Sequence, residues 1–386
     1  MSEQANPSRR DFVMGAATGA IGGGLLGMGL YSYSPLAYSR MPKVAREQAD
    51  FGACRSVKVT SISETSWFNN AHLVGDIHEA GGLLVDQYTI NWPPFGNGKG
   101  IAKGSYKDGI DTIRKMIPGD LEEAWATQTK HSIHPENPGG YSCLIEVEDL
   151  DGSKHKYLLD VGWSYDWMEQ SFKREAIDQM LAANDIEALI LTHEHFDHFW
   201  GFPVAMKYNN KIPTYAHDGF YEEGLQYIKD SNYQGDLTIL DKELNPIRPG
   251  MMAIKFNVPI ITRVYGEVSL AFNVKDKGLV LVSGCNHQGI LQMTSTAYKK
   301  LKYDNDRFYG IYGGLHISPF EDWDPKYDDL VISLGKWNFE RVGCNHCTGH
   351  LTAKKFVEAG YPVVKGTARF RTSSPDYLGN GDTITF

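Results

Sequence analysis

Six consecutive residues, His193-Glu194-His195-Phe196-Asp197-His198, hold the side chains with the clearest capacity for chemistry. They follow an apolar run, Ala188-Leu189-Ile190-Leu191-Thr192, which predicts a strand that ends at this cluster. Three imidazoles and the Asp197 carboxylate can act as metal ligands, and the strand end places them at the rim of a sheet, where a substrate can reach them. The pattern therefore predicts a site for hydrolytic metal chemistry.

Two metal ions suit this cluster better than one. Four ligands within six residues cannot all reach a single ion without distorting the backbone. Two ions about 3.5–4 Å apart can share a hydroxide and clamp an oxyanion, and the shared water is acidic enough to act as a nucleophile near neutral pH. The alternative is a surface helix start with capping side chains, but the density of ligands favours the metal site.

Further potential ligands stand where other predicted strands end. The strands predicted over 142–147 and 156–159 form a pair that leads to Asp160. The strand over 278–283 leads to Cys285 and His287, the strand over 308–312 leads to His316, and a later strand leads to His346. Because functional groups at the carboxyl ends of neighbouring strands meet at one edge of a sheet, we expect these side chains to converge.

The remaining elements must hold these strand ends in place. The sequence predicts strands over 57–62, 186–191, 252–258 and 270–274, helices over 171–183, 290–301 and 328–337, and a less regular stretch after the ligand cluster. A long irregular segment, about 64–138, is expected to be an insertion that either covers the site or forms a structural flap. The alternation of strands and helices favours an α/β fold with helices covering sheets on both sides.

From about residue 140 to 370, the chain resembles the metallo-β-lactamase fold superfamily, whose HxHxDH signature corresponds to residues 193–198. Asp160 matches the aspartate of the first motif, which orients the ligand loop. The resemblance implies a metallo-β-lactamase-like αββα sandwich with two mixed sheets and helices on the outer faces. It would form a single domain over residues 40–386.

The resemblance also implies ligand roles. His193 and His195 should bind the first metal, and Asp197 and His198 the second. His346 should close the second site, and His287 is the best candidate to complete the first. Asp197 is also expected to be catalytic.

Within the superfamily, the chain is most similar to the branch named for dihydropterin ribofuranosyl-aminobenzene phosphate synthase. Three segments carry that similarity: 283–290 (SGCNHQGI), 313–316 (GGLH) and 346–350 (HCTGH). Cys285 stands where many relatives place a bridging aspartate, so it is either a thiolate ligand or a buried thiol. His316 is expected to be an extra ligand, a proton donor to the leaving group, a substrate contact or a support behind the ligands. His350 is expected behind the ligands, and His131, His134 and His217 at the surface.

The N-terminal segment resembles a twin-arginine export signal. Ser8-Arg9-Arg10-Asp11-Phe12 precedes a mildly apolar, glycine-rich stretch over 13–30. The prediction is a signal over residues 1–39, cleaved near Ala37-Tyr38-Ser39 or left as an anchor, with the twin-arginine export machinery as a partner. The protein would then be periplasmic or secreted, or membrane-anchored if the signal is uncleaved. A transmembrane anchor or a chance arginine pair are the alternatives, although the stretch is weakly hydrophobic for a span.

Cysteine usage leaves the pairing open. The five cysteines are Cys54, Cys143, Cys285, Cys344 and Cys347, and their odd number leaves at least one unpaired within the chain. The motif Cys344-Asn345-His346-Cys347 is a weak indication of a disulfide or a zinc knuckle, because no second CxxC exists.

Composition bounds the class of function. The chain has 386 residues, of which 42% are hydrophobic and 22% are charged, and its net charge is -9. These values are typical of a globular protein, and the absence of a long basic run argues against nucleic acid as a partner. The oligomeric state stays open.

Together these observations predict an exported metal-dependent hydrolase. It would use a metal-bound hydroxide at a dinuclear site to attack a small-molecule ester, lactone, amide or phosphoester. The expected cofactors are two divalent metal ions, with zinc favoured and manganese or iron as alternatives. One alternative function is the branch's transferase chemistry, although export argues against its cytoplasmic substrates. Others are a metal-poor binding protein and an iron-dependent redox role.

Overall fold

The computed structural model describes residues 48–64, 139–260, 264–319, 323–370, 372 and 374–386. All of them belong to one compact unit, residues 33–386. The predicted export signal, nearly all of the predicted insertion, and His131 and His134 lie outside the described residues. Among the described residues, no helix combines the length and the apolar character that a membrane crossing requires.

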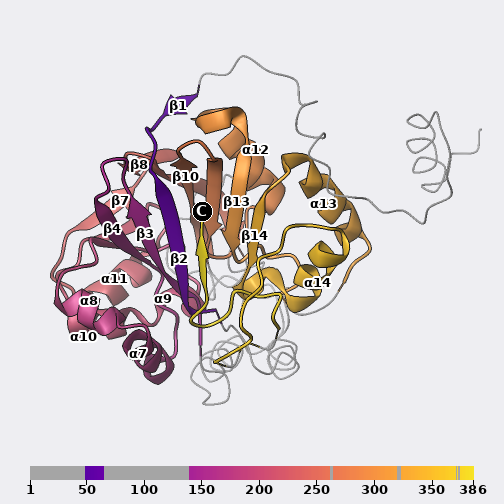
Figure 1. The fold of residues 1–386 in the computed structure, drawn as a ribbon. Coiled ribbons are helices and arrows are strands. Elements are labelled where there is room, and N and C mark those ends of the chain that lie inside the picture. The colour runs from indigo at the N-terminus through magenta and orange to yellow at the C-terminus, as the bar shows by residue number, and fades with distance from the viewer. Residues whose placement is uncertain (1–47, 65–138, 261–263, 320–322, 371, 373) are drawn as a thin grey trace, which may run out of the picture. The chain divides into compact units, whose positions relative to one another are not determined.

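Two mixed sheets form the centre of the described structure (Figure 1). The seven-stranded sheet contains, in spatial order, β15 (Thr383–Thr385), β2 (Ser56–Ser63), β3 (Ser142–Glu148), β4 (Lys154–Leu159), β5 (Ala188–Ile190), β6 (Thr214–His217) and β7 (Leu237–Leu240). The six-stranded sheet contains β14 (Arg341–Cys344), β13 (Phe308–Gly313), β11 (Gly278–Ser283), β10 (Val264–Val274), β9 (Met251–Ile260) and β8 (Leu244–Arg248). Two short strands, β1 (Ala49–Asp50) and β12 (Leu301–Lys302), pair separately.

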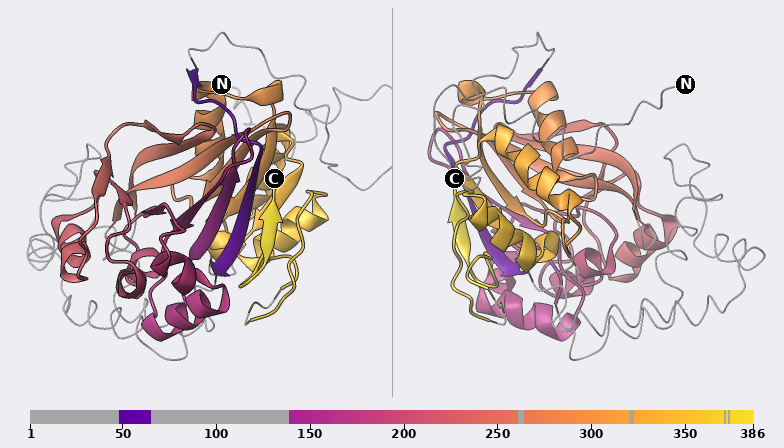
Figure 2. Two further views of the ribbon diagram at one scale, coloured as in Figure 1. Left: turned by 60° about the vertical axis from the view of Figure 1, so that its left-hand side comes forward. Right: turned by 90° about the vertical axis from the view of Figure 1, so that its right-hand side faces the viewer.

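Helices cover the outer face of each sheet (Figures 1 and 2). On the seven-stranded sheet lie α7 (Tyr165–Arg174), α8 (Ile177–Ala182), α10 (Phe202–Tyr208) and α11 (Glu222–Asp230). On the six-stranded sheet lie α12 (Ile290–Lys300), α13 (Lys326–Leu334) and α14 (His350–Glu358). Short helical turns also occur at α9 (Phe196–Phe199), η1 (Asp304–Asp306), η2 (Gly335–Trp337) and η3 (His346–Thr348).

Alternating residues along single strands explain this layering. In β3, Ile145 packs between the two sheets, whereas its neighbour Leu144 packs beneath the helices. In β5, Ile190 likewise packs between the two sheets, and Leu189 packs beneath the helices. Because successive side chains of a strand point to opposite faces, each sheet contributes to the central core and to one helix-covered core. The predicted αββα sandwich with two mixed sheets is therefore confirmed.

Some predicted elements differ from the structure. The single helix predicted over 171–183 is wrong, because Ala176 has a left-handed backbone (φ 57°) that separates α7 from α8. The hydrophobic pattern of the sequence continues across this break, because both helices bury apolar residues against the same sheet. The stretch expected to be less regular contains α10, β6, α11, β7 and β8, whose strands are only four or five residues long and carry a weak pattern.

Strand register brings the predicted ligand segments to common edges. In the seven-stranded sheet, Leu159 of β4 pairs with Ile190 of β5, and both strands are parallel. In the six-stranded sheet, Ser283, Gly313 and Cys344 are partners across the parallel strands β11, β13 and β14. The residues that follow these positions therefore leave each sheet at the same edge.

Candidate metal centre

The ligand cluster begins in the loop after β5 and continues into the short helix α9. His193 and His195 lie in the loop, and Asp197 and His198 lie in the helix. All four side chains are buried. The backbone of Asp197 accepts a hydrogen bond from the Tyr141 amide at 2.8 Å, which ties the helix to the start of β3.

Glycine is required next to this contact. Gly140 has a φ of 113°, and a Cβ atom there would lie 2.5 Å from the carbonyl oxygen of Asp197. A side chain at position 140 would therefore push the ligand helix away from the strand.

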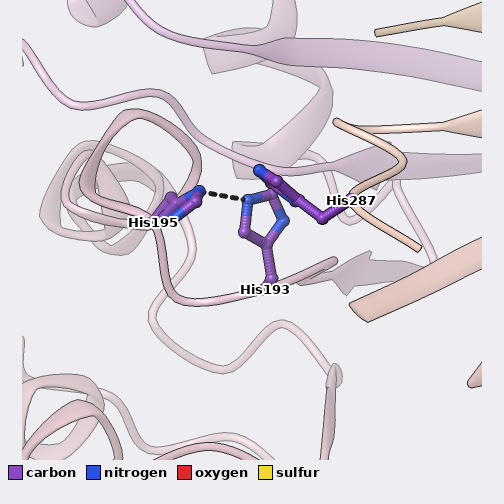
Figure 3. A group of neighbouring side chains, drawn as sticks. All are labelled: His193, His195 and His287. Carbon is purple, nitrogen blue, oxygen red and sulfur yellow. Dashed lines mark hydrogen bonds between the residues drawn. The ribbon is translucent and has the colours of Figure 1, made fainter. Parts of the chain in front are cut away.

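Two groups of three possible ligands adjoin at this edge. His193, His195 and His287 form one group, and Asp197, His198 and His346 form the other. Within each group, the ligand atoms lie within 4.8 Å of one another. Figure 3 shows the first group, whose three imidazoles face one another from the loop after β5 and the loop after β11. The two groups are neighbours, because the ring centroids of His193 and His198 are 4.2 Å apart.

Oxygen atoms behind the imidazoles contact the Nδ1 atom of four of these histidines. The Nδ1 atom of His193 lies 2.8 Å from Thr192 Oγ1, and that of His198 lies 2.7 Å from Asp160 Oδ2. The Nδ1 atom of His287 lies 2.8 Å from Glu267 Oε2, and that of His346 lies 3.1 Å from the carbonyl oxygen of Glu64. Such contacts fix the tautomer and orientation of metal-binding histidines.

These contacts leave the Nε2 atoms as lone-pair donors that face one another. A carbonyl oxygen only accepts, so His346 carries its proton on Nδ1, and the Asp160 carboxylate places the His198 proton in the same way. The two Nε2 atoms are nevertheless 3.0 Å apart. Two lone pairs at this distance repel unless a cation or a shared proton lies between them. The residues present therefore fit a metal ion.

His287 gives a second observation of the same kind. Its Nε2 atom is buried and has no hydrogen-bond partner. A buried polar atom without a partner costs roughly 1–3 kcal/mol, so its presence in a cluster of imidazoles needs an explanation. The neighbouring imidazoles of His193 and His195 indicate that this Nε2 atom is a metal ligand.

Protonation also suits metal binding. Burial lowers the pKa of His193 and His198 well below the usual range, and burial next to His316 does the same for His287. Burial alone would raise the pKa of Asp197, but the imidazoles of His198 and His346 lower it below its usual range. These neutral imidazoles and the ionised carboxylate bind metal without first losing a proton. His346 differs, because burial lowers its pKa but Cys347 and Asp197 raise it to about 9, so a metal ion there must displace a proton.

Two buried carboxylates organise the loops that carry the ligands. Asp160 accepts hydrogen bonds from the Thr192 amide at 2.7 Å and from the Thr192 hydroxyl at 2.6 Å. Glu267, in β10, accepts the backbone N–H groups of residues 285, 286 and 287. Burial raises the pKa of both carboxyl groups, and these donors act against that rise. Each carboxylate therefore joins one ligand loop to the body of a sheet.

The site also concentrates backbone strain. Asp160, Asn286, His316 and His346 have φ values of 56°, 68°, 45° and 48°. Non-glycine residues rarely adopt this left-handed conformation, which costs about 1–3 kcal/mol each and persists where surrounding contacts impose it. All four residues follow strand ends, so the strain lies where the chain turns its side chains into the site.

Sequence reasoning missed three contributors. The sequence shows Cys347 only in a weak CxxC motif, yet its Sγ atom lies within 4.8 Å of the Cys285 Sγ atom and of a ring nitrogen of His316. Its position directly after His346 was the available signal. The roles of Glu267 and the Glu64 carbonyl could not be predicted from the sequence. Glu267 lies inside a strand, and a contact made by a backbone oxygen does not depend on residue type. All five cysteines are buried and unpaired, so the structure contains no disulfide between them.

The expected surface position of His217 is wrong. Its side chain is buried at the end of β6, and its Nδ1 atom accepts the Gly219 amide at 3.0 Å. His350 is partly buried beside Tyr377, with ring centroids 4.2 Å apart, and the Tyr377 hydroxyl donates to the carbonyl of His346. His350 thus lies behind the ligand loop, where it was expected.

His217 should make the fold sensitive to acid. Burial, with help from Lys255, lowers its pKa to about 3. Between this value and the unfolded value of about 6.5, the unfolded chain binds more protons, so stability falls as pH falls through this window. From pH 6.5 to 5 we expect a loss of about 1.5 kcal/mol from this residue. Denaturant unfolding of the wild type and His217→Asn should show a shallower pH slope for the variant, and equal slopes would contradict this assignment.

Comparisons with known proteins agree with the fold. Residues 138–277 match the model of the metallo-beta-lactamase superfamily. A 7,8-dihydropterin-6-methyl-4-(beta-D-ribofuranosyl)-aminobenzene-5'-phosphate synthase from Methanocaldococcus jannaschii is 27% identical over 257 residues, which cover 57% of this chain and 84% of the synthase. The transcription termination factor FttA of Methanosarcina mazei is 25% identical over 38% of this chain, but the match covers only 23% of that factor.

Solved structures give weaker similarities. An N-acyl homoserine lactone hydrolase has a TM-score of 0.31 at 14% identity, over 60% of this chain and 76% of the hydrolase. A putative metallo-beta-lactamase from Thermotoga maritima has a TM-score of 0.28 at 18% identity, over 44% of this chain and 81% of that protein.

Proposed function

We propose that this protein is a metal-dependent hydrolase with a dinuclear site. The observation that carries the proposal is the pair of adjoining ligand groups, His193/His195/His287 and Asp197/His198/His346. Each group offers three protein ligands, and three ligands leave positions for water and substrate in a catalytic site. The substrate class is an ester, lactone, amide or phosphoester.

The ligand set defines what the chain itself contributes. Divalent ions held there would lower the pKa of water and stabilise the oxyanion of the reaction. Asp160, Glu267 and the Glu64 carbonyl hold the imidazole Nδ1 protons, so the Nε2 lone pairs stay directed into the site. Asp197 adds a negative charge between His198 and His346, with its Oδ2 atom 3.3 Å from His346 Nε2. Zinc suits this mixture of nitrogen and oxygen ligands, and Cys285 strengthens that preference over manganese.

A transferase is the second candidate. The similarity to the Methanocaldococcus synthase extends over 84% of that protein, which favours related chemistry in which the same ligands would bind a phosphate-bearing leaving group. The proposed export argues against it. Within the proposal, residues 1–39 are the twin-arginine signal and the mature chain works in the periplasm or outside the cell.

Elemental analysis of the purified mature protein tests the proposal. We expect at least two zinc or manganese ions per chain, and hydrolysis of at least one member of an ester, lactone, amide and phosphoester panel. His193→Ala, purified in parallel, controls for contaminating hydrolases. Absence of bound metal even after reconstitution would contradict the hydrolase proposal and favour a binding protein. Metal-replete protein that hydrolyses nothing, but joins a pterin diphosphate to an aryl amine, would favour the transferase.

A further inference from the structure

A second set of potential ligands follows the same aligned strand ends. Ser283, Gly313 and Cys344 are partners across three parallel strands. Cys285, His316 and Cys347 stand two or three residues beyond these positions. Because each strand leaves the sheet at the same edge, the three side chains meet, and their ligand atoms lie within 4.8 Å of one another. None of the six residues in the two groups described above belongs to this set.

The residues around this set leave little space between the three side chains and the backbone. Gly314 lies against Cys347, and a Cβ atom at position 314 would be 2.7 Å from the Cys347 Sγ atom. The Cys347 thiol lies 3.4 Å from the carbonyl oxygen of Cys285, and it also contacts the Cys285 thiol and the His316 imidazole. His316 has a strained backbone with a φ of 45°, and its Nδ1 atom is buried without a hydrogen-bond partner. Two buried thiols and an imidazole with an unpartnered nitrogen therefore share one small space.

We propose that Cys285, His316 and Cys347 form a third cation site that takes a soft divalent ion such as zinc. Two sulfur ligands and one imidazole are the donors that zinc and cadmium prefer, whereas magnesium and calcium prefer oxygen. Binding converts both thiols to thiolates and releases two protons to solvent. Both cysteines are buried, whereas His316 is partly exposed, so the fourth position of the ion would face the side open to water.

Cys285 connects this site to the dinuclear site. Its Sγ atom lies 3.3 Å from Nε2 of His198 and also groups with His193. A thiolate at this position would face ions on both sides, and its negative charge would offset their repulsion. Cys347, by contrast, groups only with Cys285 and His316 among the potential ligands of the described residues. Loss of Cys347 should therefore remove the third ion alone, whereas loss of Cys285 should weaken more than one ion.

The test compares two alanine variants of the mature protein. Cys347→Ala removes a ligand of the proposed site. Cys344→Ala is the matched control, because Cys344 is also a buried free thiol and lies three residues away at the end of β14. Each protein is stripped, reloaded with zinc for elemental analysis, and separately titrated with cadmium while the ultraviolet thiolate-to-cadmium band is recorded. We expect Cys347→Ala to hold one zinc fewer per chain than the control and to lose at least half of the band.

Equal zinc content and equal cadmium absorbance in the two variants would overturn the third site. If Cys347→Ala fails to fold, the wild type decides the question: a saturated thiolate-to-cadmium band with the intensity of two thiolates supports the site, and the intensity of one thiolate or none overturns it. Recovery of Cys285 and Cys347 as a disulfide from zinc-loaded wild type would also overturn it. The hydrolase proposal fails separately, through loss of the first two ions or of turnover.

Discussion

Replacing Asp197 by alanine is expected to remove at least one bound ion and nearly all of the activity, at least about 100-fold. Substitutions of the groups behind metal ligands already cost about 10–100-fold, and Asp197 is proposed as a ligand itself. Its carboxylate is the only negatively charged oxygen in the group with His198 and His346. Without the Asp197 carboxylate, only the two imidazoles of this group would remain to bind an ion. Zinc per chain and the hydrolysis rate, measured on the same preparation, check the result.

Asp230→Ala is the control for this experiment, because Asp230 is exposed at the end of α11, where its charge reaches no ligand group of the described structure. It should keep its metal and its activity. An Asp197→Ala protein that is fully active and metal-replete would contradict the dinuclear arrangement. A protein that keeps both ions but loses turnover would make Asp197 a catalytic group without a role in metal retention.

Replacing Asp160 is expected to weaken metal binding without removing a ligand. Asp160→Asn keeps the shape, and asparagine tolerates the left-handed backbone at this position (φ 56°). An amide, however, places an N–H group against either Thr192 or the His198 Nδ1–H, where the carboxylate now only accepts. We expect zinc affinity to fall by about 10–100-fold. Competition with a chromophoric chelator measures this change.

Asp160→Ala should have the larger effect on stability. It leaves the Thr192 amide and His198 Nδ1–H buried without acceptors, which costs about 1–3 kcal/mol for each group. Alanine in the left-handed conformation adds roughly 1–2 kcal/mol. Thermal unfolding of the metal-free proteins should therefore rank the wild type above Asp160→Asn and Asp160→Asn above Asp160→Ala. Asp185→Asn, an exposed residue that pairs with Lys156, is the control. Unchanged zinc affinity in Asp160→Asn would make the aspartate purely structural.

Local signals in the sequence were sufficient for many strands and helices and for the α/β class, whereas the two-sheet sandwich was predicted from the resemblance to a known superfamily. Strands such as β3 and β11 are apolar, alternate where they divide two cores, and end at turn residues, so their positions could be predicted without tertiary information. The break at Ala176 could not, because alanine carries no local preference for a left-handed backbone. The short strands β6 and β7 also escaped prediction, since four residues carry too little periodicity to separate a strand from a loop.

The sequence by itself determined which residues could bind metal and that they stand at strand ends, because ligand type and strand boundaries are local properties. The tertiary structure decided which of them meet. Parallel register places Cys347 beside Cys285 and His316, and packing of the sheets brings His346 to His198. It also decided that Asp160, Glu267 and the Glu64 carbonyl hold the imidazole protons. Such contacts join residues up to 282 positions apart, and no local pattern records a partner at that distance.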